Sequence, residues 1–122
     1  MKHPILALAW LACTATVWAD GPLTAQHGGV MAEAASGLRV ELVNDASGLA
    51  VYLREHSDKP LSSKGISGDI VLLGSQGKTT LALTPAEGNK LTASAPASAG
   101  AKAIVRLNLP GKGSDQVRLT LK

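Results

Sequence analysis

Short runs in which apolar and polar residues alternate recur along most of the chain. In the run 38–42 every second residue is Leu or Val, and the run 49–53 repeats this pattern. Alternation with a period of two predicts β-strands that bury one face. The residues between the two runs, Asn-Asp-Ala-Ser-Gly at 44–48, are typical of a turn. The two runs therefore predict a β-hairpin.

Six further strand-like runs are separated by turn signals rich in Gly, Pro, Asn and Ser. All the predicted strands together are 30–34, 38–42, 49–53, 70–73, 79–84, 91–95, 103–109 and 117–121. The connections 56–69 and 96–100 are longer than a tight hairpin, and we expect the chain to cross between sheets there. The predicted fold class is all-β, an immunoglobulin-like Greek-key β-sandwich of about seven to eight short strands, with a small closed β-barrel as the alternative.

The first nineteen residues have a different pattern. Lys2 is followed by a mostly apolar run over 5–12, and small and polar residues then lead to Ala19. This order predicts a cleavable signal peptide over 1–19, whose apolar run is too short to span a bilayer. We expect a periplasmic protein with no membrane span after cleavage. The alternative is a lipoprotein anchored through Cys13, although Trp10 stands where a leucine-like residue is expected.

Cleavage leaves 103 of the 122 residues, the size of one ordinary domain. Residues 20–28 lack periodicity and predict a flexible N-terminal arm, and 29–122 predict a single β-sandwich domain. Cys13 is the only cysteine and leaves with the signal, so the mature chain has no disulfide. Tyr52 is then the only aromatic residue. We therefore expect a core of Val, Leu, Ile and Ala.

Charge and composition exclude several functions. The mature chain has eleven Lys and Arg residues against nine Asp and Glu, and the basic residues are scattered singly. Neither a basic patch nor an aromatic stacking surface for nucleic acid is predicted. No nucleophile stands beside a histidine, and no carboxylates are paired at a suggestive spacing. The sequence predicts a protein that is not an enzyme and does not bind nucleic acid.

Three residues of the mature chain are candidate metal ligands: His27, His56 and Met31. Imidazole and thioether suit copper, and imidazole also suits zinc. On a straight strand His27 and Met31 would lie about 13 Å apart, so sharing an ion requires the glycine pair 28–29 to fold the chain back. A turn that aims His56 and Asp58 at one point is a second local option. The alternative interpretation makes His27 an exposed tether residue, His56 and Asp58 turn caps, and Met31 core filler.

Polar residues of the first predicted hairpin fall on the face opposite its apolar positions. Arg39, Glu41 and Arg54 predict a cross-strand charge set on a solvated face. Tyr52 falls on the face opposite Val51, where we expect it to cover the sheet.

Several segments resemble a known family. They are His-Gly-Gly-Val at 27–30, the strand 38–43, Val-Tyr-Leu-x-x-His-x-x-Lys-Pro at 51–60, and 83–93. Together, from about His27 to Leu121, they resemble small periplasmic proteins found beside heavy-metal efflux systems and the N-terminal portion of some efflux adaptor subunits. The resemblance implies His27 and His56 as metal contacts. The sequence has Glu55 where the pattern commonly has Asp, and it lacks the His-rich arm of many such proteins.

Two functional hypotheses follow. The first is a periplasmic, non-catalytic binding module that handles copper or a similar heavy-metal ion, with an efflux adaptor subunit or another periplasmic protein as its partner. The second is a metal-independent protein-interaction domain that recruits a partner strand at a sheet edge. Polar, Gly-rich strand ends and the scarcity of aromatic residues are the observations that motivate this alternative.

Overall fold

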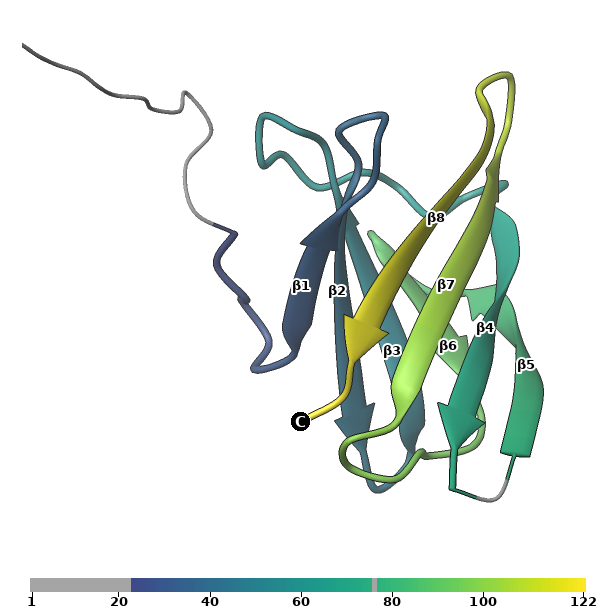
Figure 1. The fold of residues 1–122 in the computed structure, drawn as a ribbon. Coiled ribbons are helices and arrows are strands. Elements are labelled where there is room, and N and C mark those ends of the chain that lie inside the picture. The colour runs from purple at the N-terminus through teal and green to yellow at the C-terminus, as the bar shows by residue number, and fades with distance from the viewer. Residues whose placement is uncertain (1–22, 76) are drawn as a thin grey trace, which may run out of the picture.

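A computed structural model describes residues 23–75 and 77–122, and Figure 1 shows that these residues form strands joined by turns and loops. The strands are β1 (Val30–Glu33), β2 (Arg39–Asp45), β3 (Gly48–Arg54), β4 (Ser67–Gly74), β5 (Gly77–Pro85), β6 (Lys90–Ala93), β7 (Lys102–Leu109) and β8 (Gly113–Thr120). Each of the eight predicted runs overlaps one of these strands. The predicted signal peptide and Cys13 lie outside the described residues. Within the described residues there is no helix long and apolar enough to cross a membrane.

The strands form one antiparallel sheet in the order β1-β2-β3-β6-β5-β4-β7-β8. Strands consecutive in sequence are neighbours except at the β3 to β4 and β6 to β7 connections. These are the two long connections at which the sequence predicted a crossing. Because β7 returns to lie beside β4, the strands β7-β4-β5-β6 form a Greek key.

The two end strands of the sheet, β1 and β8, lie against each other, so the sheet curls into a nearly closed barrel (Figure 1). Among the described residues β1 pairs only with β2, and β8 only with β7. The contact between the end strands is extended by Lys122, whose Nζ donates to the Gly28 carbonyl at 3.3 Å. The all-β prediction is confirmed, and the barrel alternative describes this single curled sheet.

Aliphatic side chains fill the interior, as the alternating pattern predicted. On β3 the inward side chains of Leu49, Val51 and Leu53 are fully buried, and on β7 Val105 and Leu107 are buried while their neighbours face solvent. Each such Leu or Val contributes about 1.5–3 kcal/mol by leaving water. This burial stabilises the fold without help from a disulfide, because the sequence holds a single cysteine.

Two strands begin three or more residues earlier than predicted. β4 starts at Ser67 and β8 at Gly113, against predicted starts at 70 and 117. Residues 114–116 are polar and carry no apolar alternation, yet they pair in register with residues 106–108 of β7. Backbone pairing with a long neighbour therefore extends a strand beyond the part that its apolar residues mark.

Candidate functional site

The outer face of β1, β2 and β3 carries two rows of mostly polar side chains. The register partners of the first row are Met31, Glu41 and Tyr52, and those of the second row are Glu33, Arg39 and Arg54. The two rows are two residues apart along each strand, which is about 7 Å. Because successive side chains of a strand alternate between faces, both rows lie on the face opposite the core residues.

Glu41 is the centre of the first row and is only 1% exposed. Its carboxylate accepts backbone N–H bonds from Gln26 at 3.0 Å, His27 at 2.8 Å and Gly29 at 2.9 Å. Burial raises the pKa of Glu41, but these N–H donors and the His27 imidazole outweigh it, so that the pKa lies below its ordinary value. Glu41 therefore stays ionised and holds the chain that leads into β1.

The bend that the glycine pair allows is present. Gly28 has φ +76°, and a Cβ on Gly29 would lie 2.3 Å from the Leu42 carbonyl oxygen. Glycine adopts the φ of position 28 at low cost, and at position 29 it leaves room for the close backbone approach. The bend carries His27 back over the outer face of β2 and β3, where it meets Glu41 and Tyr52.

The His27 imidazole is fixed on two sides. Its Nδ1 lies 3.1 Å from Glu41 Oε1, and its ring stacks on Tyr52 with centroids 3.6 Å apart and planes 6° apart. An ionised carboxylate only accepts hydrogen bonds, so the Nδ1 of a neutral imidazole carries the proton and Nε2 carries the lone pair. The side chain is 39% exposed. His27 thus presents an oriented imidazole near the surface.

His56 has the same relation to the second row. Its Nδ1 lies 2.6 Å from Glu33 Oε2, which Arg39 Nε also approaches at 3.3 Å. The hydrogen bond from His56, followed by that from Arg39, lowers the pKa of Glu33 against the opposing effect of burial. The same carboxylate argument places the Nδ1 proton toward Glu33 and directs Nε2 away from it. The His56 side chain is half exposed.

Two buried arginines face each other in the second row. Arg39 and Arg54 are register partners and are 6% and 4% exposed. Oδ1 of Asp58 lies 3.4 Å from Arg39 Nη1 and 3.1 Å from Arg54 Nε, which offsets the repulsion between the two like charges. Asp58, with φ 76°, is the one non-glycine residue of the described chain in the left-handed region. The turn at 55–59 thus directs Asp58 toward the arginines.

Arg54 also contacts the N-terminal segment, by which we mean residues 23–29. Its Nη2 donates to the Thr24 carbonyl at 2.9 Å and lies 3.5 Å from Met31 Sδ. Its Nη1 is buried and has no hydrogen-bond partner among the described residues. The predicted solvated charge face is therefore wrong for these positions, because the N-terminal segment and the turn at 55–59 lie against the charged side chains.

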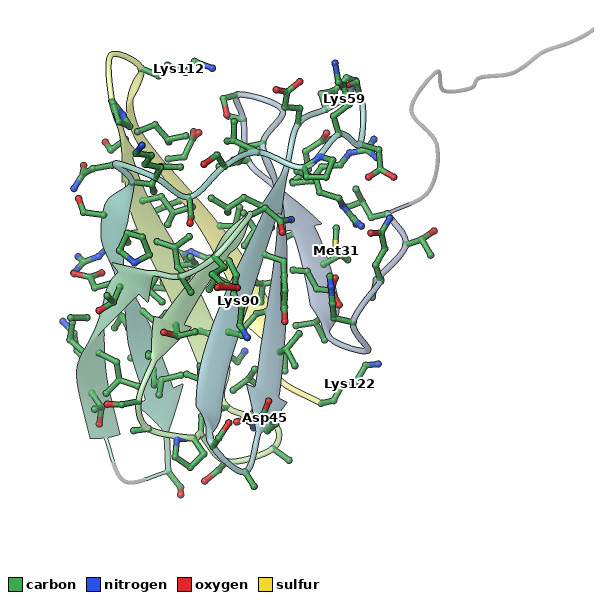
Figure 2. All side chains as sticks on the ribbon, turned by 180° about the vertical axis from the view of Figure 1, so that it is seen from behind. Met31, Asp45, Lys59, Lys90, Lys112 and Lys122 are labelled. Carbon is green, nitrogen blue, oxygen red and sulfur yellow. The ribbon has the colours of Figure 1, made fainter. Side chains whose placement is uncertain are left out.

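The structure places the three predicted ligands as follows. Met31 belongs to the first row as the register partner of Glu41, and His27 contacts this row through Glu41. Figure 2 shows Met31 on the side of β1 along which the N-terminal segment runs, and its partial exposure there does not fit core filler. His56 contacts the second row through Glu33. Over residues 23–75 and 77–122 no three His, Cys, Asp or Glu side chains gather as a metal-binding group.

Sequence reasoning missed the two carboxylates that orient the histidines. Glu33 and Glu41 lie on the outward positions of β1 and β2, which the period of two could have assigned to one face. The sequence holds no signal for their distant partners. The His27 bond to Glu41 spans fourteen positions, and the His56 bond to Glu33 spans twenty-three.

We expect Gly37→Ala to displace His56. Gly37 has φ +96°, and a Cβ there would lie 3.2 Å from the His56 Cβ. The strained backbone and the close contact together predict a loss of about 1–2 kcal/mol in the free energy of unfolding and a weakened bond to Glu33. Urea denaturation and imidazole nitrogen NMR measure the two effects. Gly74→Ala is the control, because Gly74 has no atom near its missing Cβ and no positive φ.

Comparison of this chain with protein-family models, with curated proteins and with solved structures finds no match.

Proposed function

We propose that this chain is a periplasmic, non-catalytic binding module that handles copper or a similar heavy-metal ion for an efflux system. The observation that carries the proposal is the environment of the two imidazoles. Each donates through Nδ1 to a carboxylate, at 3.1 Å for His27 and 2.6 Å for His56. Histidines that bind metals commonly donate the other ring N–H to a carboxylate, which fixes the ring and makes the ligating nitrogen more basic.

The donor set suits a soft or borderline ion. Nε2 of His27 and of His56 are the proposed ligating atoms, and the Met31 thioether is the third candidate ligand in the first row. A thioether favours Cu(I), whereas imidazole nitrogens accept Cu(II) and Zn(II) as well. Arg54 Nη2 is 3.5 Å from Met31 Sδ, so recruiting the thioether requires this guanidinium to move away. The proposed partner is an efflux adaptor subunit or another periplasmic protein.

Titration of the chain from residue 20 onward with Cu(I), Cu(II) and Zn(II) tests the proposal. We expect micromolar or tighter dissociation constants, which is about 8 kcal/mol of binding free energy or more. His27→Ala and His56→Ala should each weaken binding, and Met31→Leu should weaken only Cu(I) binding. Imidazole NMR should show the metal at Nε2. Binding that persists unchanged in a His27→Ala, His56→Ala double variant would refute the assignment.

The role of the orienting carboxylates has its own matched pair of variants. Glu33→Gln removes the charge that orients His56, and Glu87→Gln removes the charge of an exposed glutamate. We expect Glu33→Gln to weaken metal binding about 10-fold to 100-fold, as changes behind a ligating histidine commonly do. Glu87→Gln should leave it unchanged. Equal affinities for the two variants would show that Glu33 does not support a metal-binding imidazole.

A second candidate function is recruitment of a partner strand at a sheet edge. The specific observation in its favour is that, among the described strands, none pairs with the β6-facing edge of β5 over residues 77–83. No histidine lines either of the two hollows along this edge, so the two functions are testable separately.

A further inference from the structure

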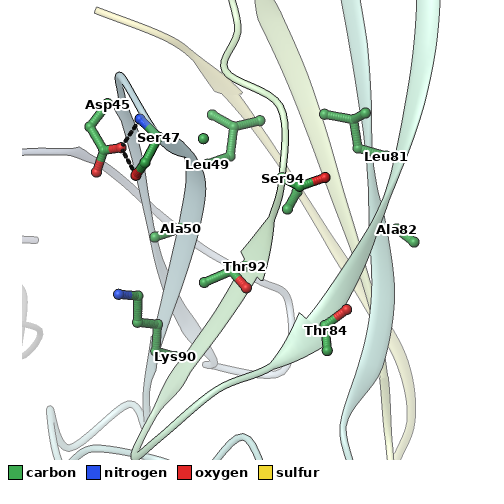
Figure 3. A pocket seen from close by; sticks show the side chains of 12 residues that line it. Asp45, Ser47, Leu49, Ala50, Leu81, Ala82, Thr84, Lys90, Thr92 and Ser94 are labelled. Carbon is green, nitrogen blue, oxygen red and sulfur yellow. Dashed lines mark hydrogen bonds between the residues drawn. The ribbon is translucent and has the colours of Figure 1, made fainter.

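The strand that pairs with β5 changes part of the way along β5. It pairs with β4 from Gly77 to Leu83, but with β6 only at Thr84 and Pro85. Figure 3 shows β5 and β6 diverging beyond Thr84, so that Ala82 lies across a gap from Ser94. We call the gap between residues 77–83 of β5 and residues 94–101 the β5 slit. In the part of the chain that the structure describes, no strand pairs with this edge of β5.

The backbone of β5 directs hydrogen-bonding groups into the slit. Beyond the strand end, Ala86 N donates to the Lys90 carbonyl at 2.8 Å, and Thr84 pairs with Thr92. Successive residues of an antiparallel strand direct their N–H and C=O groups to opposite neighbours, so the even-numbered positions of β5 face the β6 side. The N–H and C=O groups of Lys78, Thr80 and Ala82 therefore point into the slit. Such an edge is a template for another strand.

The slit has room for a chain. Two hollows of about 440 and 640 Å³ lie along it, and both are lined by Leu81. The bank opposite β5 is built from small residues, namely Ser94, Ala95, Pro96, Ala97, Ser98 and Ala99. Asn44 holds this bank, since its Nδ2 donates to the Ala97 carbonyl at 2.7 Å and its Oδ1 accepts from Ala97 N at 3.1 Å. The bank is therefore fixed in position rather than free to close onto β5.

The charged residues that line the slit are mostly basic. Lys90 lines one hollow and Lys102 the other, and Asp45 is the one acidic residue in either lining. The Asp45 carboxylate is already engaged by the hydroxyl and N–H of Ser47, at 2.6 and 2.9 Å. Lys102 thus offers an ammonium group to an incoming chain, and Lys90 offers a second one, whose Nζ also lies 5.7 Å from the Tyr52 ring centroid. Acidic residues complement both groups.

We propose that the β5 slit docks one extended segment of a partner protein, which adds a strand to β5. The proposal rests on the second candidate function and deepens it, because it names the edge and the occupant. The segment has small apolar residues at alternate positions, which pack on Leu81 inside the slit, polar residues between them, and acidic residues at its ends. A second copy fits less well, because its β5 edge is faced by its own bank of residues 94–101.

The test uses the chain from residue 20 onward in EDTA and the synthetic peptide Glu-Glu-Ser-Val-Ser-Val-Ser-Glu-Glu. We expect the peptide to shift the amide NMR signals of Thr80 and Ala82 and to slow their hydrogen exchange at least about 10-fold. The amides of Thr79 and Leu81, which face β4, should change little. If the Thr80 and Ala82 signals do not respond at peptide concentrations up to about 1 mM, the proposal is overturned.

Two variants and one further peptide test whether the peptide binds in the slit. Thr80→Pro removes an N–H that faces the slit, at an edge position where proline is tolerated, and should abolish binding. Thr80→Ala keeps that N–H and should bind normally. A peptide with Lys in place of the terminal Glu residues should bind about 10-fold more weakly. The exchange data on the unaltered chain do not depend on whether Thr80→Pro folds.

The remaining outcomes are also decisive. Shifts of Thr80 and Ala82 that depend on protein concentration without peptide would assign the slit to a second copy and overturn the proposal. Because EDTA is present and no histidine lines the slit, failure of metal binding leaves this result unaffected. Peptide binding that survives Thr80→Pro in a folded chain would place the peptide elsewhere and also refute the slit.

Discussion

Glu41→Ala is expected to lower the free energy of unfolding by about 3 kcal/mol. The carboxylate is 1% exposed and accepts three backbone N–H bonds and the His27 imidazole. Hydrogen bonds to a charged group contribute about 1.5–3 kcal/mol, and water reaching the freed donors recovers part of the sum. Urea denaturation measures the loss. Faster amide exchange at Gln26, His27 and Gly29 should accompany it.

Glu41→Gln adds a dependence on pH. Both carboxylate oxygens face donors, so either orientation of the amide brings its NH2 group against an N–H donor, and we expect a loss of about 2 kcal/mol at pH 7. The folded-state pKa of Glu41 lies below its ordinary value. Its contribution is therefore present above the ordinary pKa of about 4.3 and is lost as the pH falls through the folded value. The difference in the free energy of unfolding between the unaltered chain and Glu41→Gln should therefore become smaller as the pH falls.

Glu87→Ala is the control for the Glu41 variants, because Glu87 is exposed and makes no hydrogen bond or ion pair among the described residues. Its effect should stay within about 0.5 kcal/mol. If Glu41→Ala and Glu87→Ala proved equally stable, the carboxylate of Glu41 would not hold the N-terminal segment. A difference that stayed constant from pH 7 to pH 3 would contradict the lowered pKa.

Gly29→Ala is expected to cost about 3 kcal/mol and to disturb the start of β1. The added Cβ would lie 2.3 Å from the Leu42 carbonyl oxygen and 2.9 Å from Val43 Cγ2. The backbone carbonyl belongs to β2 and cannot rotate away, so β1 must separate from β2. Overpacking of this kind costs about 1–3 kcal/mol, and loss of the adjacent bond from Gly29 N to Glu41 places this case at the upper end.

Gly28→Ala is the matched control at the neighbouring position. A Cβ on Gly28 meets no atom within 4 Å, but φ is +76°, so the cost is the backbone strain of about 1–2 kcal/mol alone. Thermal or urea unfolding of the two variants compares steric and conformational costs one residue apart. Metal titration of Gly29→Ala should also show weaker binding, because His27 is carried by the same segment. A Gly29→Ala variant as stable as Gly28→Ala would rule out the close contact.

Much of the fold could be predicted from the sequence because its signals are local. Short apolar or alternating runs mark a part of each of the eight strands, and the long connections 56–69 and 96–100 mark the two places where neighbours in sequence are not neighbours in the sheet. Local signals do not determine how a sheet closes. The choice between a sandwich and a barrel depended on whether β1 meets β8, which lie at opposite ends of the sequence.

The candidate site was harder to predict for the same reason. The residue types were visible, but their partners lie far away in sequence. Glu41 was expected on a solvated face, and it is buried because residues 24–29 fold back over it. Arg39 and Arg54 are tolerated side by side because Asp58, in a turn beyond β3, lies between them. The unpaired edge of β5 likewise could not be predicted from the sequence, because it depends on how few residues of β5 pair with the short strand β6.

The stack of His27 on Tyr52 makes the intrinsic fluorescence of the domain sensitive to the state of this face. Trp10 and Trp18 precede residue 20, so a chain that begins there has Tyr52 as its single intrinsic fluorophore. Because the two ring centroids are 3.6 Å apart, we expect the imidazole to quench the tyrosine emission in a way that depends on this distance. Release of the N-terminal segment and arrival of a paramagnetic ion would each change the emission. The tyrosine fluorescence of the unlabelled protein therefore measures changes on this face.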